Sequence, residues 1–564
     1  MNRIIEIFIM RKTVLLLISI FIIYALPAQD KMLSILKTEV DRNMSVLKEQ
    51  PVPAYYMSYR IFDRNAYRIE SSFGKIMTSN PSKYRLYHVG VRVGDHQMDN
   101  TREIKDDDLG EEYYTGANLI VNEDDPYAIQ KTLWLKTDEL YKSAVKRYEK
   151  VKANVAVKVA SEDKSDDFSV EKPETFFEKP LPFDRLLGDI NKWEQKIKRY
   201  SEAFSDNKDL LSGSATFELE VVRKYFVGSD GAQIAENTCG YRISINASAI
   251  AEDGMNLPLY RSYFAHKVED LPSDEQILSD VKYISNMISD LRKAPVAESY
   301  SGPVLMTARA SGVFFHEIFG HRIEGARLKK ETDAQTFKKK TGELVLPEDF
   351  TITFDPQIKE YGKLKLSGYY TFDDEGVRGQ KVKIVDNGIL KSFLMSRVPI
   401  EGFPNSNGHG RAMIYYNTVT RQSNMIVESS KARTDKELRA MLVEEAKKTG
   451  KPYAYMIDDV SGGFTTTGRY MPNAFNVTPL VVYRIYTDGR PDELVRGVDL
   501  VGTPLAMFSQ ISACGNDFAV FNGYCGAESG SLPVSCVAPS LFVKMVETQK
   551  MSKSQSQPPI LERP

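Results

Sequence analysis

The sequence predicts an α+β protein with more than one domain. Helices and strands are interspersed in its first half, where amphipathic segments are separated by stretches rich in aromatic and β-branched residues. Strands dominate the second half, where Asn387-Gly388 and Asp488-Gly489 each lie between two apolar runs, a pattern typical of antiparallel hairpins. A length of 564 residues also favours more than one hydrophobic core.

The first half contains segments with helical spacing of apolar residues, at 31–48, 124–152, 183–204 and 273–293. The last has the clearest signal, because Ser273 and Gln276 have the spacing of a capping box ahead of an apolar stripe. Strands are expected in 53–93 and between the third and fourth helices. The charged stretch 161–179 has few aliphatic residues, so we expect an exposed connector there.

The boundary between the domains is expected near Pro295 and Ser301-Gly302-Pro303, which follow the fourth helix. Beyond it, Thr434 and Glu437 form a second capping-box signature, and Gly450 is a candidate stop for that helix. The predicted organisation is a signal peptide at 1–28, an N-terminal domain at 29–298, a C-terminal domain at 299–550 and a disordered tail at 551–564.

The N-terminal segment has the pattern of a secretory signal. Arg11 and Lys12 precede an apolar run at 13–26, and Ala28 ends a small-residue cleavage site before Gln29. The run is short for a membrane span, and no second apolar segment supports it. We therefore expect an exported, periplasmic protein that is cleaved near Ala28 and keeps no stable membrane span. The alternative is an uncleaved segment that anchors the chain as a membrane-bound scaffold.

Charge and cysteine content exclude some classes of protein. The 76 acidic and 74 basic residues nearly balance, and no large basic patch is present, so the composition gives no case for nucleic acid binding. Four cysteines are too few for a disulfide scaffold in a chain of this length. Cys514, Cys525 and Cys536 lie close together near the C-terminus. Two of them could form a disulfide in an exported protein, or one could be a metal ligand.

The segment His316-Glu317-Ile318-Phe319-Gly320-His321 places two imidazoles and a carboxylate among apolar residues. These are the parts of a zinc hydrolase: two nitrogen ligands, and an acid that can take a proton from metal-bound water. Histidines at this spacing on an ideal helix point about 140° apart. Both can reach one metal only if the helix ends, bulges or unwinds between them, which Gly320 permits. The alternative is a buried helix end with two hydrogen-bonded histidines.

Further segments accompany this motif, which continues to Gly325. In order along the chain they are 372–376 with the hairpin after it, 405–411, 496–502, 515–517, and 523–526 followed by Pro533-Val534. Together they resemble the TldD/PmbA family of metallopeptidases, specifically its TldD-like branch. The resemblance covers 299–545 well, and the N-terminal part only by the order of its helices and strands. A co-linear set of motifs is more specific than the histidine motif alone.

The resemblance implies a two-domain architecture, with a mixed α/β N-terminal domain and a C-terminal domain rich in antiparallel strands. It implies zinc held by His316, His321 and Cys525, with Glu317 as the general base that activates zinc-bound water. It also implies an active site enclosed within a dimer, either a homodimer or a heterodimer with a related family member. Peptide substrates would bind as an added strand. The alternatives for Cys525 are a disulfide with a neighbouring cysteine or a buried free thiol.

Three other residues are candidates around this site. His409 lies in a Gly-rich loop and could orient substrate or stabilise an oxyanion, and Arg411 is similar. The alternative for both is a position on a surface loop. Glu324 could accept a hydrogen bond from the second ring nitrogen of a ligating histidine, with helix capping or a surface ion pair as its alternative. Residues 373–375 are expected to form a hydrogen-bonded turn rather than a second metal site.

The sequence therefore predicts an exported, zinc-dependent metallopeptidase that hydrolyses peptide bonds in unfolded or extended peptides. The chief alternative is a non-catalytic, zinc-containing subunit that binds peptides or serves the assembly of a TldD/PmbA-type complex. Glu317 discriminates between the two, because a structural zinc site does not need that carboxylate.

Overall fold

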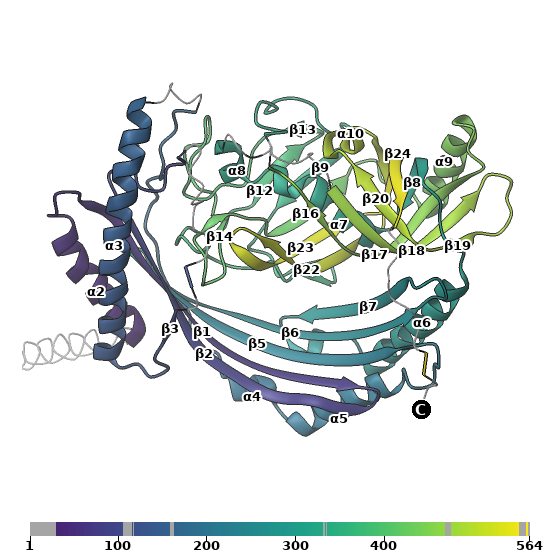
Figure 1. Ribbon diagram of the computed structural model, residues 1–564, viewed down its shortest axis with the longest axis horizontal. Coiled ribbons are helices and arrows are strands. Elements are labelled where there is room, and N and C mark those ends of the chain that lie inside the picture. The colour runs from purple at the N-terminus through teal and green to yellow at the C-terminus, as the bar shows by residue number, and fades with distance from the viewer. Residues whose placement is uncertain are drawn as a thin grey trace, which may run out of the picture.

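The computed structural model describes residues 30–104, 115–116, 118–157, 163–330, 333, 335–468, 475–551 and 560–561. The predicted signal peptide and most of the predicted tail lie outside the described residues. The described chain has an α+β fold in two parts (Figure 1). A long curved sheet with helices forms the first part, and the second part lies over the concave face of that sheet. None of the described helices combines the length and the apolar composition that a bilayer crossing requires.

The first part is a sheet in the order β3-β2-β1-β5-β6-β4, with β7 also paired to β6. Its strands are β1 Ala54–Ser72, β2 Lys75–Val93, β3 Leu119–Ile120, β4 Thr175–Phe177, β5 Ser212–Gly228, β6 Gln233–Ile250 and β7 Asn256–Ala265. Neighbours are antiparallel except β4, which runs parallel to β6. Alternate residues of β5 and β6 are buried, so one face of the sheet is apolar and the other is polar.

Helices cover the apolar face and one end of this sheet (Figure 1). They are α2 Lys31–Leu47, α3 Pro126–Val157, α4 Phe183–Leu187, α5 Ile190–Glu202 and α6 Asp274–Lys293. Tyr200 of α5 and Ile284 of α6 share one apolar cluster with Phe217 and Ile243 of the sheet. The single helix expected at 183–204 is two helices, because Gly188 takes a φ of 65° between them. The polar face of β5 and β6 is left facing the second part.

The second part contains two larger sheets. One has the order β13-β12-β9-β16-β23-β22. Its strands are β9 Phe350–Phe354, β12 Val382–Asp386, β13 Ile389–Leu390, β16 Asn424–Ser429, β22 Ala519–Ala527 and β23 Gly530–Ala538. The shorter pairs β10 Glu360–Tyr361 with β11 Leu364–Lys365, and β14 Gly410–Arg411 with β15 Val419–Thr420, lie outside it.

The other sheet has the order β17-β8-β24-β20-β18-β19, with β21 paired to β24, and an additional pairing of β17 with β18 closes it on itself. Its strands are β8 Tyr300–Met306, β17 Tyr453–Thr465, β18 Phe475–Tyr486, β19 Glu493–Val495, β20 Val498–Gly502, β21 Ile511–Cys514 and β24 Leu541–Lys550. The helices of this part are α7 Ala308–Ile318, α8 Gly325–Lys329, α9 Asp435–Lys448 and α10 Pro504–Phe508.

The local signals of the second half are confirmed. Asn387 and Gly388 have φ values of 49° and 78° and connect the antiparallel strands β12 and β13, as a two-residue hairpin turn requires. Thr434 and Glu437 make both hydrogen bonds of a capping box at the start of α9. Gly450 follows the helix with a φ of 68°. Helix α7 packs against strands of both larger sheets.

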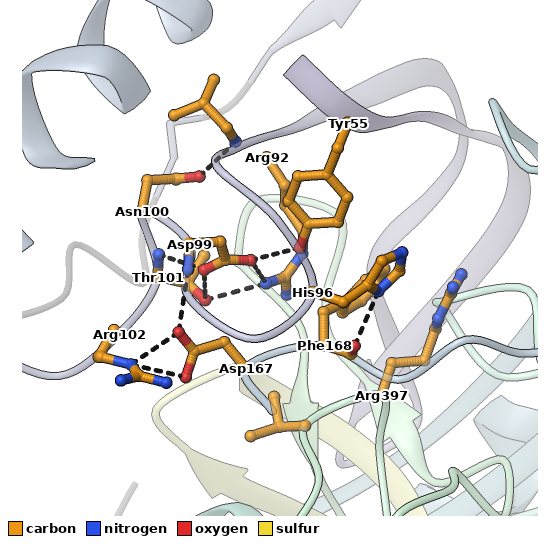
Figure 2. A network of polar contacts seen from close by, with 12 residues as sticks. Tyr55, Arg92, His96, Asp99, Asn100, Thr101, Arg102, Asp167, Phe168 and Arg397 are labelled. Carbon is orange, nitrogen blue, oxygen red and sulfur yellow. Dashed lines mark hydrogen bonds and ion pairs between the residues drawn. The ribbon is translucent and has the colours of Figure 1, made fainter. Parts of the chain in front are cut away.

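A polar network joins the two parts of the chain near the loop after β2 (Figure 2). Arg397, from the second part, stacks its guanidinium on the ring of Phe168 at 4.0 Å. The neighbouring Asp167 carboxylate accepts a hydrogen bond from Arg102 Nε at 2.8 Å. Asp167 and Phe168 are only 3% and 2% exposed, so the prediction of an exposed connector at 161–179 is wrong here. A charged stretch can be buried where each charge meets a partner, as Asp167 does.

Candidate metal centre

The helix that carries the histidine motif breaks near Gly320, as predicted. Helix α7 ends at Ile318, and a turn of 3₁₀ helix covers Gly320–Arg322. His316 lies in the last turn of α7 and His321 in the 3₁₀ turn. The break brings the two imidazole rings to a centroid separation of 5.0 Å. One metal ion can therefore reach both rings despite their spacing in the sequence.

Arg322 stabilises this broken helix end. Its buried guanidinium donates through Nη1 to the carbonyl oxygen of Glu317 at 2.8 Å, and through Nη2 to Thr465 Oγ1 at 2.8 Å. The last carbonyl groups of a helix have no partner within the helix, so the first bond satisfies one of them. The second bond ties the helix end to β17 and fixes the direction in which the chain leaves it.

Three potential ligand atoms converge at this point. The side chains of His316, His321 and Cys525 are buried, and one ligand atom from each lies within 4.8 Å of the others. Cys525 is carried by β22, and its Sγ is 3.3 Å from His321 Nε2. The predicted set of two histidines and one cysteine is thus brought together from a broken helix and a distant strand.

Glu324 contacts the other nitrogen of His321. Its Oε2 is 3.1 Å from His321 Nδ1 and accepts a hydrogen bond from Arg327 Nε at 2.7 Å. With Nδ1 turned to a carboxylate, Nε2 faces Cys525 and is the nitrogen available to a metal. Burial alone raises the pKa of the Glu324 carboxyl, but the charges of His321 and Arg327 lower it to about 2. The contact predicted for Glu324 is present.

Electrostatics favour the ionised thiol of Cys525. Burial raises the pKa of this thiol, yet the imidazoles of His321 and His316 outweigh burial and hold the pKa well below its usual value. The thiolate is the form of cysteine that binds metal ions. Burial also acts on Glu317, where it raises the pKa of the carboxyl although both histidines oppose the shift.

The three side chains open onto a cleft of about 580 Å³ between the polar face of the long sheet and the second part. Glu317 also lines this cleft. Strand β17 approaches Glu317 closely at Gly463, where a Cβ would lie 2.7 Å from Glu317 Cγ. From the long sheet, β6 and β7 contribute Arg242, Ser244, Tyr260 and Ser262.

Arg421 is a residue of the site that sequence reasoning missed. Its Nη2 donates to the carbonyl oxygen of Cys525 at 2.5 Å, and its Nη1 donates to Ser529 Oγ at 2.8 Å and the carbonyl oxygen of Gly530 at 2.9 Å. Arg421 therefore holds the end of the β22–β23 hairpin that presents Cys525. It is only 1% exposed, and nothing in the single sequence distinguishes such an arginine from a surface one.

His409 and Arg411 do not line the cleft, so neither side chain is placed to contact a substrate there. Both are buried and absent from the residues that line the cleft. His409 Nε2 is 3.0 Å from Ser423 Oγ, and Arg411 Nη2 donates to the carbonyl oxygen of Pro533 at 3.0 Å. The structure therefore corrects the prediction: these side chains support the loops and strands behind the site, since their hydrogen bonds are made to the protein itself.

Two other predictions concern cysteines and carboxylates. The four cysteines are all free thiols in the structure, so Cys525 is not in a disulfide. Asp373 Oδ1 accepts hydrogen bonds from the backbone N–H groups of Glu375 and Val377, both at 2.9 Å. The turn expected at 373–375 is confirmed.

The fold and the site define an α+β protein in which a broken helix and a distant strand bring two histidines and a cysteine together at one buried position. Residues 299–550 match the family model described as PmbA/TldA metallopeptidase C-terminal domain, so this part of the chain is a domain of the TldD/PmbA type.

Relatives agree with this assignment. A metalloprotease of Archaeoglobus fulgidus is 29% identical over 271 residues, which cover 48% of this chain and 57% of the relative. A zinc metalloprotease TldD homolog of Saccharolobus solfataricus is 24% identical over 380 residues, covering 64% and 78% of the two chains. The crystal structure of TldE from Thermococcus kodakarensis has a TM-score of 0.58 at 15% identity, with 92% of this chain and 100% of that chain covered. This last likeness establishes the fold.

Proposed function

We propose that this protein is a zinc-dependent peptidase that hydrolyses peptide bonds in unfolded or extended peptides. The observation that carries the proposal is the convergence of His316, His321 and Cys525 within 4.8 Å, in a cleft that Glu317 also lines. Two nitrogens and a thiolate suit zinc, whose bond lengths place tetrahedral ligand atoms about 3.3–3.6 Å apart. Three protein ligands also leave one position open, as catalytic zinc requires.

Each residue of the site would have its own role in the reaction. Zinc bound at this position would polarise the peptide carbonyl and lower the pKa of a water molecule beside it. Glu317 accepts the proton of the attacking water and passes it to the leaving amine. Glu324 orients His321, and Arg421 positions the backbone of Cys525. The apolar residues around α7 exclude bulk water from the back of the site.

The shape of the cleft supports an extended substrate. Strand β22 is the last strand of its sheet, and one edge of it has no partner strand among the described residues. The backbone groups of that edge could pair with a peptide that lies along it, next to Cys525. A folded domain would not enter a cleft of about 580 Å³ between two sheets.

The proposal is tested by measuring bound zinc and hydrolysis of an unstructured peptide mixture with the wild type and the Glu317→Gln variant side by side. We expect zinc in both proteins and cleavage by the wild type alone. Zinc in both with cleavage by neither would favour the alternative of a non-catalytic peptide-binding or assembly subunit. Absence of zinc from the wild type would overturn the assignment of the site.

We further propose export to the periplasm and a dimer, either a homodimer or a heterodimer with a related family member. Export is supported by the basic residues Arg11 and Lys12, the apolar run at 13–26 and the small-residue site that ends at Ala28. The likeness to TldE of Thermococcus kodakarensis and the match to the PmbA/TldA family model support a related family member as the partner. Mass analysis of the mature N-terminus tests cleavage near Ala28, and light scattering of the purified protein, alone and with a co-expressed relative, tests the assembly.

A further inference from the structure

Among the residues that line the cleft, Arg242 has a distinctive position. Arg242 belongs to β6, whose alternating pattern buries Tyr241 and Ile243 against the helices and turns Arg242 toward the cleft. Its Nη1 donates to Ser262 Oγ at 3.0 Å and to the carbonyl oxygen of Asn522 at 3.4 Å. These contacts hold the guanidinium across the cleft, from the long sheet to the strand that carries the cysteine.

Two aromatic rings also lie close to the guanidinium of Arg242. The carbon of the guanidinium lies 5.2 Å from the ring centroid of Tyr524 and 5.4 Å from that of Phe264. An arginine that lies over aromatic rings can still bind a planar anion through its remaining N–H groups. Tyr524 is 57% exposed, so this end of the cleft is open to solvent.

Among the described residues that line the cleft, no carboxylate pairs with Arg242. The cleft's other arginine, Arg327, pairs with Glu528 at 2.7 Å, and the remaining carboxylate, Glu317, lies at the metal centre. Among the described residues Arg242 makes no ion pair within 4.0 Å. Its neighbour across the sheet, Glu218, contacts two other arginines, at 3.2 and 3.7 Å.

Arg242 contacts β22 close to Cys525, the cysteine of the candidate metal centre. Arg242 contacts Asn522 and Tyr524, which precede Cys525 by three residues and one residue. At about 3.3 Å per residue, these contacts lie within about 10 Å of Cys525 along the strand. A peptide that runs along β22 in an extended conformation would cover this distance with two or three residues.

We propose that Arg242 is a specificity-determining residue, which binds a substrate carboxylate two or three residues from the cleaved bond. The inference rests on the proposed peptidase function and names the substrates it favours. The carboxylate can come from the C-terminus of a short peptide or from an acidic side chain. Arginine binds either through two parallel N–H···O hydrogen bonds.

The test compares matched peptides on wild type, Arg242→Gln and Arg242→Lys. One pair of peptides differs only in a free or amidated C-terminus, and a second pair differs only in Glu or Gln near the cleaved bond. We expect the wild type to prefer one carboxylate peptide by about 10- to 100-fold in kcat/KM, which corresponds to one charge-assisted bidentate contact. Arg242→Gln should lose that preference, and Arg242→Lys should restore part of it. The pair that shows the effect identifies the source of the carboxylate.

Binding of the same peptides to Glu317→Gln, with and without Arg242→Gln, separates this inference from the proposed function. Fluorescence anisotropy should show tighter binding of the carboxylate peptide only while Arg242 is present, even if no peptide is cleaved. Lys83→Gln is the control, because it removes a positive charge from an exposed position of the same sheet, outside the residues that line the cleft. A preference that survives Arg242→Gln, or a wild type with no preference in binding or turnover, would overturn the inference.

Discussion

Cys525 Sγ lies 3.3 Å from His321 Nε2, although 204 positions separate the two residues in the sequence. The contact joins the last strand of one sheet to the end of a helix buried between two sheets. Neither element alone provides a metal site: α7 and its 3₁₀ turn supply two nitrogens, and β22 supplies the sulfur. The site therefore depends on the contact between these two elements and on the residues that hold them in place.

Cys525→Ser should lose bound zinc under dialysis against a chelator that the wild-type protein withstands. A serine hydroxyl stays protonated near neutral pH and is a poor substitute for the thiolate. Metal analysis after dialysis gives the readout. Cys536→Ser is the matched control, because Cys536 is also a buried free thiol but its Sγ lies 3.6 Å from Met425 Sδ rather than at the site. Equal zinc loss from both variants would contradict the assignment of Cys525.

Glu324→Gln should weaken zinc binding by about 10- to 100-fold, because the carboxylate that orients His321 is replaced by a neutral amide. A competition titration with a chromogenic chelator measures the change. Asp333→Asn serves as the control, since Asp333 also pairs with Arg327, at 3.3 Å, but does not contact His321. The role of Glu324 would be refuted by a zinc affinity that is the same in Glu324→Gln and the control.

Gly463→Ala should reduce turnover by about 100-fold while zinc remains bound. The new Cβ would lie 2.7 Å from Glu317 Cγ and 2.7 Å from the carbonyl oxygen of Asn476, so it displaces the proposed base. A displacement of about 1 Å is enough for an effect of this size. Peptide hydrolysis is measured beside metal content. Gly468→Ala is the control, because a Cβ at that position would meet no atom of the described residues within 4 Å; equal activity of both variants would count against Glu317.

Acid should destabilise the protein through His409. Burial, opposed by a hydrogen bond to Asn407, lowers the pKa of His409 to about 3, from about 6.5 in the unfolded chain. The neutral ring therefore contributes its full stability above about pH 6.5, and this contribution is lost as the pH falls from there toward 3. At about pH 5 the loss is about 2 kcal/mol. Urea unfolding at about pH 7 and pH 5 should show a smaller loss in His409→Gln than in the wild type, and equal losses would disprove the assignment.

Local chemistry made part of this structure predictable. The capping box at Thr434, the turn at Asn387-Gly388 and the helix break at Gly320 depend on neighbours in the sequence, and all three are present. Cys525 could be assigned only through the resemblance to a family, because its partners lie in another element.

Neither the burial of a polar side chain nor its pairing with a residue far along the chain could be predicted from the sequence. His409 has the same Gly-rich surroundings as a surface loop, yet it is fully buried. Asp167 is buried because Arg102 meets it across 65 positions. Arg242 and Arg421 reach the site from strands or loops whose position depends on the complete sheet order, which no single segment specifies.

The position of α7 limits how an ion would enter and leave the proposed zinc site. Phe314, Phe315 and Ile318 of this helix belong to the main apolar core, so His316 cannot move away from the site unless that core opens. The β22–β23 hairpin is attached differently, since β22 pairs on one side only within the described part of the chain and Arg421 holds its end. If the proposed zinc site is occupied, loading and release of the ion would therefore depend on local fluctuation of the hairpin, while the pair of histidines would separate only when the surrounding core unfolds.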